Sequence, residues 1–543
     1  MGSSTTEFDA LEREVVDHLF ELQPAYAVAL GLHAYDGRTP DLSATSTDSW
    51  SSGADRLLGR LAAVDPGDLS TEREVDRFLL RLLLESPLFD LRDAHELERN
   101  PLSYVGMFSL TSYLARPYAP ATDRVVSMER ILDGVPAVLE VGRKRLRGPL
   151  PRPFVDLALT MGDELPTHFG EAEQFAQRAG ARARIARARG VAERALHEFV
   201  VWLRAEELPR ATNDFALGPE RYRKLLSVRE GVDVPIEEIR DAGAADLRRN
   251  QARLAEIARS AGRTSSELVA DLATDHPAAD AILATARSFV DETRTFVVAK
   301  DLVTIPEPAV CRVEETPPYS RAWTTASMNP PGAFDAAAPE GIYFVTLVDP
   351  VWSPQQQEEW LRSLNRPLLR NITVHEVDPG HYLQYLHLRA RPGSLARKVY
   401  ISASFSEGWA HYAEQLAIEA GIDDGRREAE VAQLSDALLR DCRLLASIGL
   451  HTERWPVDRA TELFRSEALL EQLPAEREAL RGTFNPEYFC YTLGKLAILN
   501  ARRRFLASKF HGSLREFHDA VLGSGSPPVG LIERLLDMPT STP

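Results

Sequence analysis

The residues best suited to chemistry lie in one short segment, residues 371–384, which reads NITVHEVDPGHYLQ. His375 and Glu376 begin like the HExxH signature of zinc peptidases. In that signature two histidines four residues apart on one helix face bind the metal, and the glutamate between them is the general base. In this chain the next histidine is His381, six positions after His375. A regular helix would place it about 240° round the axis, where the two imidazoles could not bind one ion.

The residues between the two histidines favour a distorted helix. Pro379 cannot donate a hydrogen bond to the carbonyl of His375 and clashes with it, and Gly380 tolerates unusual backbone angles. We therefore expect the helix to be distorted between Asp378 and His381. A local bulge of one extra residue would bring His381 close to the face of His375, so that both could bind one ion.

A third ligand is available downstream, in residues 404–416, which read SFSEGWAHYAEQL. This segment reads as a helix with Glu407 in its first turn and Glu414 seven residues on, on much the same face. Two histidines and one carboxylate, with water in the remaining position, form a catalytic zinc set. We therefore predict one zinc ion per chain, bound by His375, His381 and Glu407.

The surroundings of Glu407 favour this interpretation over chance. A His-Glu pair alone is common, and a histidine beside Pro-Gly often marks only a turn. An acid in an apolar and aromatic helix, however, is costly to bury unless it is paired or bound to a metal. Glu407 is the better ligand candidate, while Glu414 or Asp378 could hydrogen-bond a ligating histidine.

The elements that must position these residues are mostly helices. Apolar residues recur at helical spacing over many segments. The clearest are Phe8–Leu22, Val125–Leu146, Arg187–Leu203, Ile236–Ser260, Arg426–Leu450 and Phe489–Leu506. Turn-forming Pro and Gly punctuate them without dividing the chain into independent halves. We expect a mainly α fold, continuous from a helical region at residues 1–300 to a catalytic region at residues 301–543.

One region departs from the helical pattern. Between residues 298 and 350 the period fades, and strand-like runs occur at Val310–Val313 and Gly341–Val348. A β-edge beside the catalytic site could hold an extended peptide by main-chain hydrogen bonds, with Tyr343 as a candidate substrate-binding residue. A short structural sheet under a loop is an equally good interpretation.

Composition describes an ordinary folded protein and excludes several function classes. Of 543 residues, 44% are hydrophobic and 26% charged, and the net charge is −17. So acidic a chain is poorly suited to bind nucleic acid or an anionic membrane. Its three cysteines form neither a disulfide framework nor a CxxC pair. The sequence has neither a membrane-spanning apolar run nor a secretory signal pattern, so we expect a cytoplasmic protein.

These motifs resemble a known family, the bacterial proteins catalogued as domain of unknown function 885 (DUF885), relatives of the helical HExxH zinc metallopeptidases. The family's hallmark is His-Glu-x-x-Pro-Gly-His followed by Glu-Gly-Trp-Ala. This chain has HEVDPGH at residues 375–381 and EGWA at residues 407–410. Further matches along nearly the whole chain are PAYAVALGLHAYD from Pro24, NPL from Asn100, YAP from Tyr118, RILDGVP from Arg130, GLH from Gly449 with Trp455, and YTLGK from Tyr491.

The resemblance implies a large helical metallopeptidase-like fold with a deep cleft, of which residues 1–300 form one side. Two departures fall near the expected site. Ser447 stands where the family commonly has an aspartate, and Tyr382 stands where it often has a second histidine. Neither removes a proposed ligand, but both leave the substrate open.

The resemblance also indicates residues beyond the metal. It points to Tyr491, rather than Tyr488, as a hydroxyl aimed at the developing oxyanion, with core packing as the competing interpretation. His451 is a second candidate donor to the transition state, or else a helix-capping residue. Arg502 lies about 20° round the same helix face from Tyr491 and about 16 Å further along. It is a candidate for binding a substrate carboxylate, although a solvated surface role fits its Arg-Arg-Arg run.

Three functions fit the sequence. The first is a zinc-dependent hydrolase that cleaves a peptide or amide bond in a short peptide or amino-acid conjugate, with Glu376 as general base. The second is a metal-dependent biosynthetic enzyme that cleaves, or eliminates on, a modified peptide-like intermediate. The third is a non-catalytic binding protein with the same fold. The retained Glu376 argues against the third, because a protein without catalysis would be free to lose it.

Overall fold

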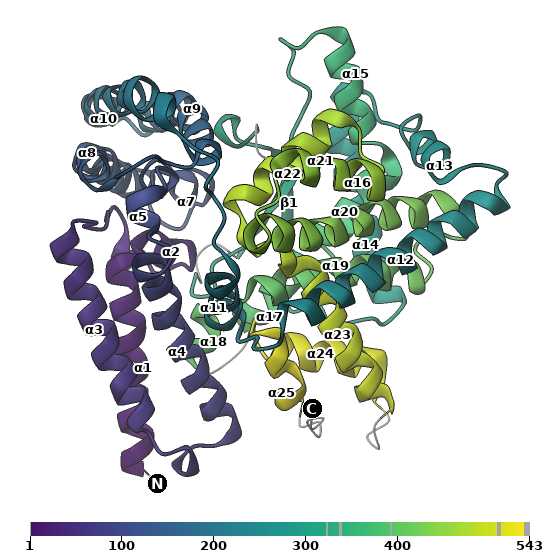
Figure 1. Cartoon of the computed structure of the whole chain (residues 1–543), viewed down its shortest axis with the longest axis horizontal. Coiled ribbons are helices and arrows are strands. Elements are labelled where there is room, and N and C mark those ends of the chain that lie inside the picture. Colours follow the sequence, from purple (N-terminus) through teal and green to yellow (C-terminus); the bar gives the residue numbers. More distant parts are fainter. Residues whose placement is uncertain (1, 322–323, 336–338, 391–393, 508–511, 537–543) are drawn as a thin grey trace. The chain divides into compact units, whose positions relative to one another are not determined.

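A computed structural model describes residues 2–321, 324–335, 339–390, 394–507 and 512–536. The chain forms two compact units (Figure 1). Unit 1 comprises Met1–Leu217, Pro331–Pro339 and Gly393–Tyr400, and unit 2 comprises Gly218–Pro330, Glu340–Pro392 and Ile401–Pro543. The region boundary expected at residue 300 falls inside unit 2, so helices from residue 218 onward belong to the unit that holds the candidate site.

Unit 1 is helical. Its helices are α1 (Gly2–Leu22), α2 (Pro24–Ala29), α3 (Ala44–Ala63), α4 (Thr71–Arg92), α5 (Glu96–Arg99), α6 (Leu102–Val105), α7 (Thr111–Ala115), α8 (Ala121–Arg145), α9 (Arg152–Arg178), α10 (Arg182–Trp202) and α18 (Leu395–Val399). Helices α8, α9 and α10 pack around one apolar core. The distant α18 joins this unit through a buried ion pair, in which Arg397 Nε lies 2.8 Å from Asp76 Oδ1 in α4.

Unit 2 holds the remaining helices and the sheet. Its helices are α11 (Pro219–Glu230), α12 (Ile236–Ser260), α13 (Ser265–Leu272), α14 (Ile282–Ala299), α15 (Pro354–Ser363), α16 (Arg366–Glu376), α17 (His381–Ala390), α19 (Ala403–Glu419), α20 (Arg427–Thr452), α21 (Val457–Glu467), α22 (Gln472–Phe484), α23 (Cys490–Ala507), α24 (Leu514–Gly523) and α25 (Ile532–Leu535). All the helices predicted from apolar spacing are present, and α12 matches its predicted bounds at both ends. The mainly α prediction is therefore confirmed. No helix in the described part of the chain is long and apolar enough to cross a membrane.

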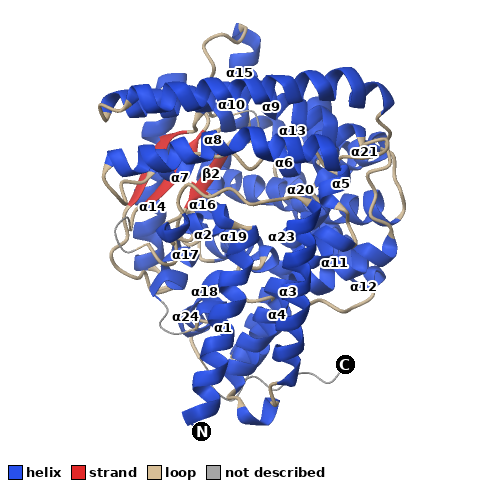
Figure 2. Ribbon diagram, turned by 90° about the vertical axis from the view of Figure 1, so that its left-hand side faces the viewer, coloured by secondary structure: helices blue, strands red, loops and turns tan. Residues whose placement is uncertain are grey.

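Within the described residues the sheet has three strands, β1 (Cys311–Glu315), β2 (Ala326–Asn329) and β3 (Gly341–Val345), drawn red in Figure 2. β3 is central, parallel to β1 and antiparallel to β2. The sequence predicted β1 and β3, but it gave no signal for β2. Every residue of β3 is buried, and the hydroxyl of Tyr343 lies 3.3 Å from Thr373 Oγ1 in α16. The sheet thus packs against the helix that carries His375.

Helices α19 and α23 approach each other at two glycines. A Cβ on Gly408 in α19 would lie 2.4 Å from the Cα of Gly494 in α23. A Cβ on Gly494 would lie 1.8 Å from the carbonyl oxygen of Ser404. Any side chain at either position would therefore force the two backbones apart. This crossing fixes the position of Glu407, directly before Gly408, relative to the first turn of α23.

We predict that Gly494→Ala destabilises the protein. The added methyl group would collide with backbone rather than with a movable side chain, and overpacking of this kind costs about 1–3 kcal/mol or more. The midpoint of thermal unfolding should fall by several degrees. Gly523→Ala in α24 is the matched control, because its Cβ would have no neighbour within 4 Å. Equal midpoints of thermal unfolding for the two variants would show that the close approach of α19 and α23 does not contribute to stability.

Candidate metal centre

The two histidines are brought together by a complete break in the helix. Helix α16 ends at Glu376, and α17 begins at His381 after a four-residue link. The distortion was predicted, but it is a break into two helices rather than a bulge of one residue. Gly380 passes so close to His375 that a Cβ there would lie 1.8 Å from the His375 carbonyl oxygen. The carbonyl of Pro379, in the link, accepts a hydrogen bond of 2.7 Å from Trp409 Nε1, which ties the link to α19.

His375, His381 and Glu407 converge on one point. The Nε2 atoms of His375 and His381 lie 3.5 and 3.4 Å from Glu407 Oε2, and one donor atom from each of the three residues lies within 4.8 Å of the others. The two rings are 4.8 Å apart and steeply inclined, at 86°. Donor atoms about 2.1 Å from a tetrahedral ion lie about 3.4 Å from one another. These three side chains therefore fit a divalent metal ion with little adjustment.

A carboxylate orients His375. Its Nδ1 lies 2.6 Å from Glu414 Oε1. An ionised carboxylate only accepts hydrogen bonds, so Nδ1 donates to Glu414, and Nε2, which points toward Glu407, is the nitrogen that could bind a metal in place of its own proton. Glu414 is itself held by Arg440 at 2.9 Å and by the amide of Asn371 at 3.2 Å. Of the two supporting acids considered from sequence, Glu414 takes this position, while Asp378 pairs with Arg294 at 3.0 Å instead.

The charges of the cluster suit a cation. Burial and the charge of Arg440 lower the pKa of His375, but hydrogen bonds to Glu407 and Glu414 outweigh them and raise it to about 9. Burial raises the pKa of Glu407, yet the charge of His381 and the hydrogen bonds of both histidines hold it well below its usual value. Burial also raises the pKa of Glu414. The charge of Arg440 is the strongest opposing effect, and the pKa is held well below its usual value. Both carboxylates are therefore ionised at neutral pH.

Glu376 directly follows the cluster residue His375 in the sequence but does not belong to the cluster. It is the last residue of α16 and is partly exposed. Its carboxylate makes no hydrogen bond or ion pair with the residues that the structure describes. An acceptor that adjoins a metal ligand and is free of other partners can take a proton from a water molecule.

Tyr491, in the first turn of α23, lies next to the metal ligands. Nη2 of Arg440 is 3.3 Å from His375 Nδ1, and the guanidinium carbon of the same arginine is 5.8 Å from the centre of the Tyr491 ring. Burial, followed by the charge of Glu407, raises the pKa of Tyr491 well above its usual value. Its hydroxyl makes no hydrogen bond within the described residues. The hydroxyl of Tyr488, by contrast, donates to Glu478 Oε2 at 2.9 Å, so Tyr491 is the tyrosine available to the metal centre.

Two other predicted site residues lie away from the cluster. His451 is about 16 Å along α20 from Arg440, and its Nε2 bonds to the carbonyl of Gly482 at 2.8 Å. It closes a contact between helices instead of facing the ligands. Tyr343 is fully buried in the central strand with its hydroxyl against α16, which leaves it no exposed surface for a substrate.

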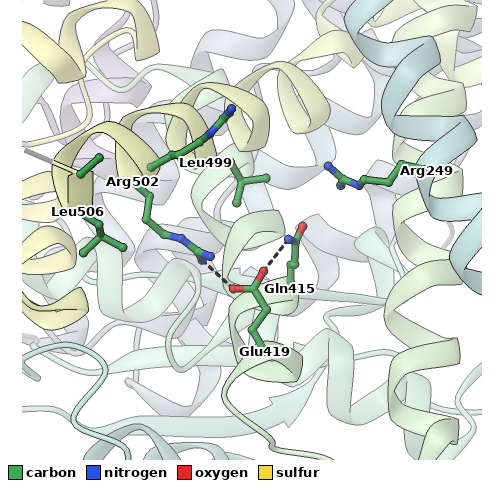
Figure 3. Close-up of a pocket in the computed structure, with 8 residues that line it drawn as sticks. Arg249, Gln415, Glu419, Leu499, Arg502 and Leu506 are labelled. Atoms are coloured by element: carbon green, nitrogen blue, oxygen red, sulfur yellow. Dashed lines mark hydrogen bonds and ion pairs between the residues drawn. The ribbon is translucent and has the colours of Figure 1, made fainter.

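Arg502 lies in a separate pocket of about 710 Å³, shown in Figure 3. Its guanidinium is held by Glu419 at 2.8 Å and by the hydroxyl of Tyr412 at 3.1 Å. Glu419 is twelve residues after Glu407 on α19, about 18 Å along the axis. Arg502 therefore does not share the metal centre, although it lies on the same helix face as Tyr491.

The two departures from the family pattern are internal hydrogen-bonding residues. Ser447 Oγ donates to the carbonyl of Pro486 at 2.7 Å and lies 2.8 Å from the hydroxyl of Tyr222. The hydroxyl of Tyr382 donates to the carbonyl of Val310 at 2.7 Å. Neither side chain contacts the ligand set within the described residues.

Sequence analysis missed the arginines that surround the site. Arg440 and Arg443 are both buried in α20, in a stretch that is otherwise largely apolar. A cation in an apolar helical stretch is costly unless it is paired, and this signal could have drawn attention to them. Their partners lie on other helices and could not be read from spacing.

Helical architecture and a two-histidine, one-glutamate cluster define this protein as a mainly α protein with a candidate metal centre. A family model described as "Bacterial protein of unknown function (DUF885)" matches residues 24–536. The chain belongs to this family. No curated protein matches it.

Solved structures of two proteins that are assigned by inference as lipoproteins, the first of them described as of unknown function, have the same fold. The protein from Shewanella oneidensis has a TM-score of 0.80 and 22% identity over 97% of this chain and 99% of its own. The protein from Colwellia psychrerythraea has a TM-score of 0.82 and 16% identity over 98% of this chain and 99% of its own. At such identities the similarity shows the fold alone.

We predict that the purified chain binds one divalent metal ion and that His381→Ala abolishes this binding. Two remaining ligands cannot hold the ion against dialysis, because each lost ligand removes both a bond and the geometry of the site. Metal content after dialysis, measured by mass spectrometry, tests this prediction. His387→Ala, on the same helix with its Nε2 bonded to the carbonyl of Thr304 at 2.7 Å, should keep the full metal content. Metal retained in His381→Ala would remove this residue from the ligand set.

Proposed function

We propose that this protein is a metal-dependent hydrolase, with zinc as the expected ion, that cleaves a peptide or amide bond in a short peptide or amino-acid conjugate. The observation that carries the proposal is the convergence of His375, His381 and Glu407, together with Glu376, which follows His375 in the sequence and has a carboxylate without a partner among the described residues. A structural zinc site would normally use four protein ligands, whereas three ligands leave a position open for water and substrate.

The chain's own residues divide the chemistry among them. A zinc ion held by the three ligands would supply Lewis acidity and lower the pKa of a water molecule. Glu376 accepts the proton of the attacking water and passes it to the leaving amine. The hydroxyl of Tyr491 donates a hydrogen bond to the oxygen of the scissile carbonyl as negative charge develops there. The ordinary pKa of a phenol, about 10, already keeps this hydroxyl protonated at neutral pH.

The other two functions use the same cluster. A biosynthetic cleavage or elimination would need the same ligands and base, and no contact in the described part of the chain favours it over hydrolysis. A non-catalytic binding protein would have no use for the placement of Glu376. Substrate, zinc identity and the expected cytoplasmic location all remain predictions.

We predict that Glu376→Gln lowers turnover by about 10²–10⁴-fold and leaves the metal content unchanged. The amide keeps the shape of the side chain but cannot accept the proton. The substrate is first identified with the wild-type chain, by incubation with a library of dipeptides and N-acyl amino acids and detection of products by mass spectrometry. A near-normal rate in the variant would refute the role of general base, and loss of metal would show that Glu376 supports the ligands instead.

We predict that Tyr491→Phe lowers kcat by about 10²-fold with a much smaller change in KM, as expected for a donor that acts mainly in the transition state. Tyr488→Phe is the matched control. Its hydroxyl donates to Glu478, so its loss should lower stability slightly and leave kcat unchanged. Similar kinetics in the two variants would assign Tyr491 to packing alone.

A further inference from the structure

Guanidinium groups and phenol rings alternate away from the metal centre. Arg440 contacts His375 and lies 5.8 Å from the centre of the Tyr491 ring. The guanidinium carbon of Arg443 lies 5.0 Å from the centre of the Tyr491 ring and 5.2 Å from that of Tyr488. Arg481, from α22, lies 5.4 Å from the centre of the Tyr488 ring. We call these three arginines and two tyrosines the arginine–tyrosine ladder.

The anions of this region satisfy two of the three arginines. Arg440 pairs with Glu414 at 2.9 Å. Arg443 makes two hydrogen bonds of 2.8 Å each to Glu478. Arg481 has no hydrogen bond or ion pair from its side chain within the described residues, although it is only partly exposed. A guanidinium withdrawn from water without a hydrogen-bonded anion is unfavourable, and Arg481 only shares the more distant charge of Glu478 with Arg443, so the ladder ends in a cation with unused hydrogen-bond donors.

Arg481 also lies within electrostatic reach of the catalytic tyrosine. Burial and Glu407 raise the pKa of Tyr491, whereas Arg443 and Arg481 act in the opposite direction. In the ladder only Tyr488 and Arg443 separate Arg481 from Tyr491, so an anion bound by Arg481 would lie two ring contacts beyond Tyr491. Arginine is well suited to hold it, because its planar fork matches a carboxylate through two parallel hydrogen bonds.

We propose that Arg481 binds the free carboxylate of the substrate, so that the hydrolase acts on short peptides or N-acyl amino acids with an unblocked C-terminus. This inference rests on the proposed function and narrows its substrate class. It transfers to Arg481 the carboxylate-binding role that the sequence suggested for Arg502, whose guanidinium is held by Glu419 in another pocket. Arg481 is a specificity-determining residue that recognises the substrate end and takes no part in the proton transfers.

Binding without turnover gives the sharpest test. The metal-loaded full chain with Glu376→Gln is titrated calorimetrically with N-acetyl-alanyl-alanine and with its C-terminal amide. The acid should bind about 10- to 100-fold more tightly than the amide, as expected for a charge-assisted contact of about 1.5–3 kcal/mol. Adding Arg481→Gln should abolish this preference, and Arg481→Lys should restore part of it, because it keeps the charge but loses the fork.

Arg459→Gln is the matched control. The guanidinium of Arg459 also lies over an aromatic ring, 3.9 Å from the centre of the Trp455 ring, but Arg459 is exposed on α21. It should retain the full preference for the acid. Thermal melting and metal content of each variant confirm that folding and the ligand set are intact. If Arg481→Gln fails to fold, an acid preference that is reduced but not abolished in a folded Arg481→Lys variant still supports the inference, and an unchanged preference overturns it.

The outcomes separate this inference from the proposed function. Equal binding of acid and amide, no measurable binding of the acid, or a preference that survives Arg481→Gln would each overturn the carboxylate assignment. Displacement of the acid by an equal concentration of inorganic phosphate would also overturn it, because Arg481 would then be an unselective anion site. Absence of hydrolysis by the wild-type chain, with the acid preference and its loss in Arg481→Gln both present, would refute the hydrolase and leave the binding role in place.

Discussion

The contact on which the candidate site most depends is the crossing of α19 and α23 at Gly408 and Gly494. Glu407 immediately precedes the first glycine, and Tyr491 lies one helical turn before the second. Because glycine has no side chain, the two backbones can touch. Glu407, a candidate metal ligand, and Tyr491, a candidate oxyanion donor, therefore lie on either side of this contact although they are far apart in the sequence. Lys495 anchors the crossing further through an unexposed ion pair of 2.6 Å with Asp246 in α12.

Buried charge is the second constraint, and it makes the site a single network. Arg440 holds Glu414, which orients His375, and the same guanidinium packs against the ring of Tyr491. Removing either partner of such a pair leaves an uncompensated buried charge, which typically costs about 3–5 kcal/mol. A change at Arg440 would therefore disturb both the metal ligand and the tyrosine. This coupling means that the orientation of His375 and the position of Tyr491 cannot vary independently.

The sequence predicted which side chains come together in the cluster better than it predicted the residues around them. Ligand type and the Pro-Gly break identified His375, His381 and Glu407, because each signal is local and metals accept few residue types. Spacing along one helix placed Arg502 on the face of Tyr491, but it could not show that this face continues into a separate pocket. Periodicity found the strand containing Tyr343 without revealing that it is the buried central strand. The role of Arg440 depends on partners from α16, α19 and α23, and no local pattern encodes such long-range pairing.

The same carboxylate connects metal binding with the state of the tyrosine. An oxyanion donor must remain protonated, and a phenol buried beside two arginines would be driven toward ionisation. Burial and the negative charge of Glu407 oppose Arg443 and keep the pKa of Tyr491 high. The negative charge of Glu407 therefore acts both on the two histidines of the cluster and on the phenol of Tyr491. The crossing of α19 and α23 makes this possible, because it brings Glu407, directly before Gly408, close to the first turn of α23, where Tyr491 lies.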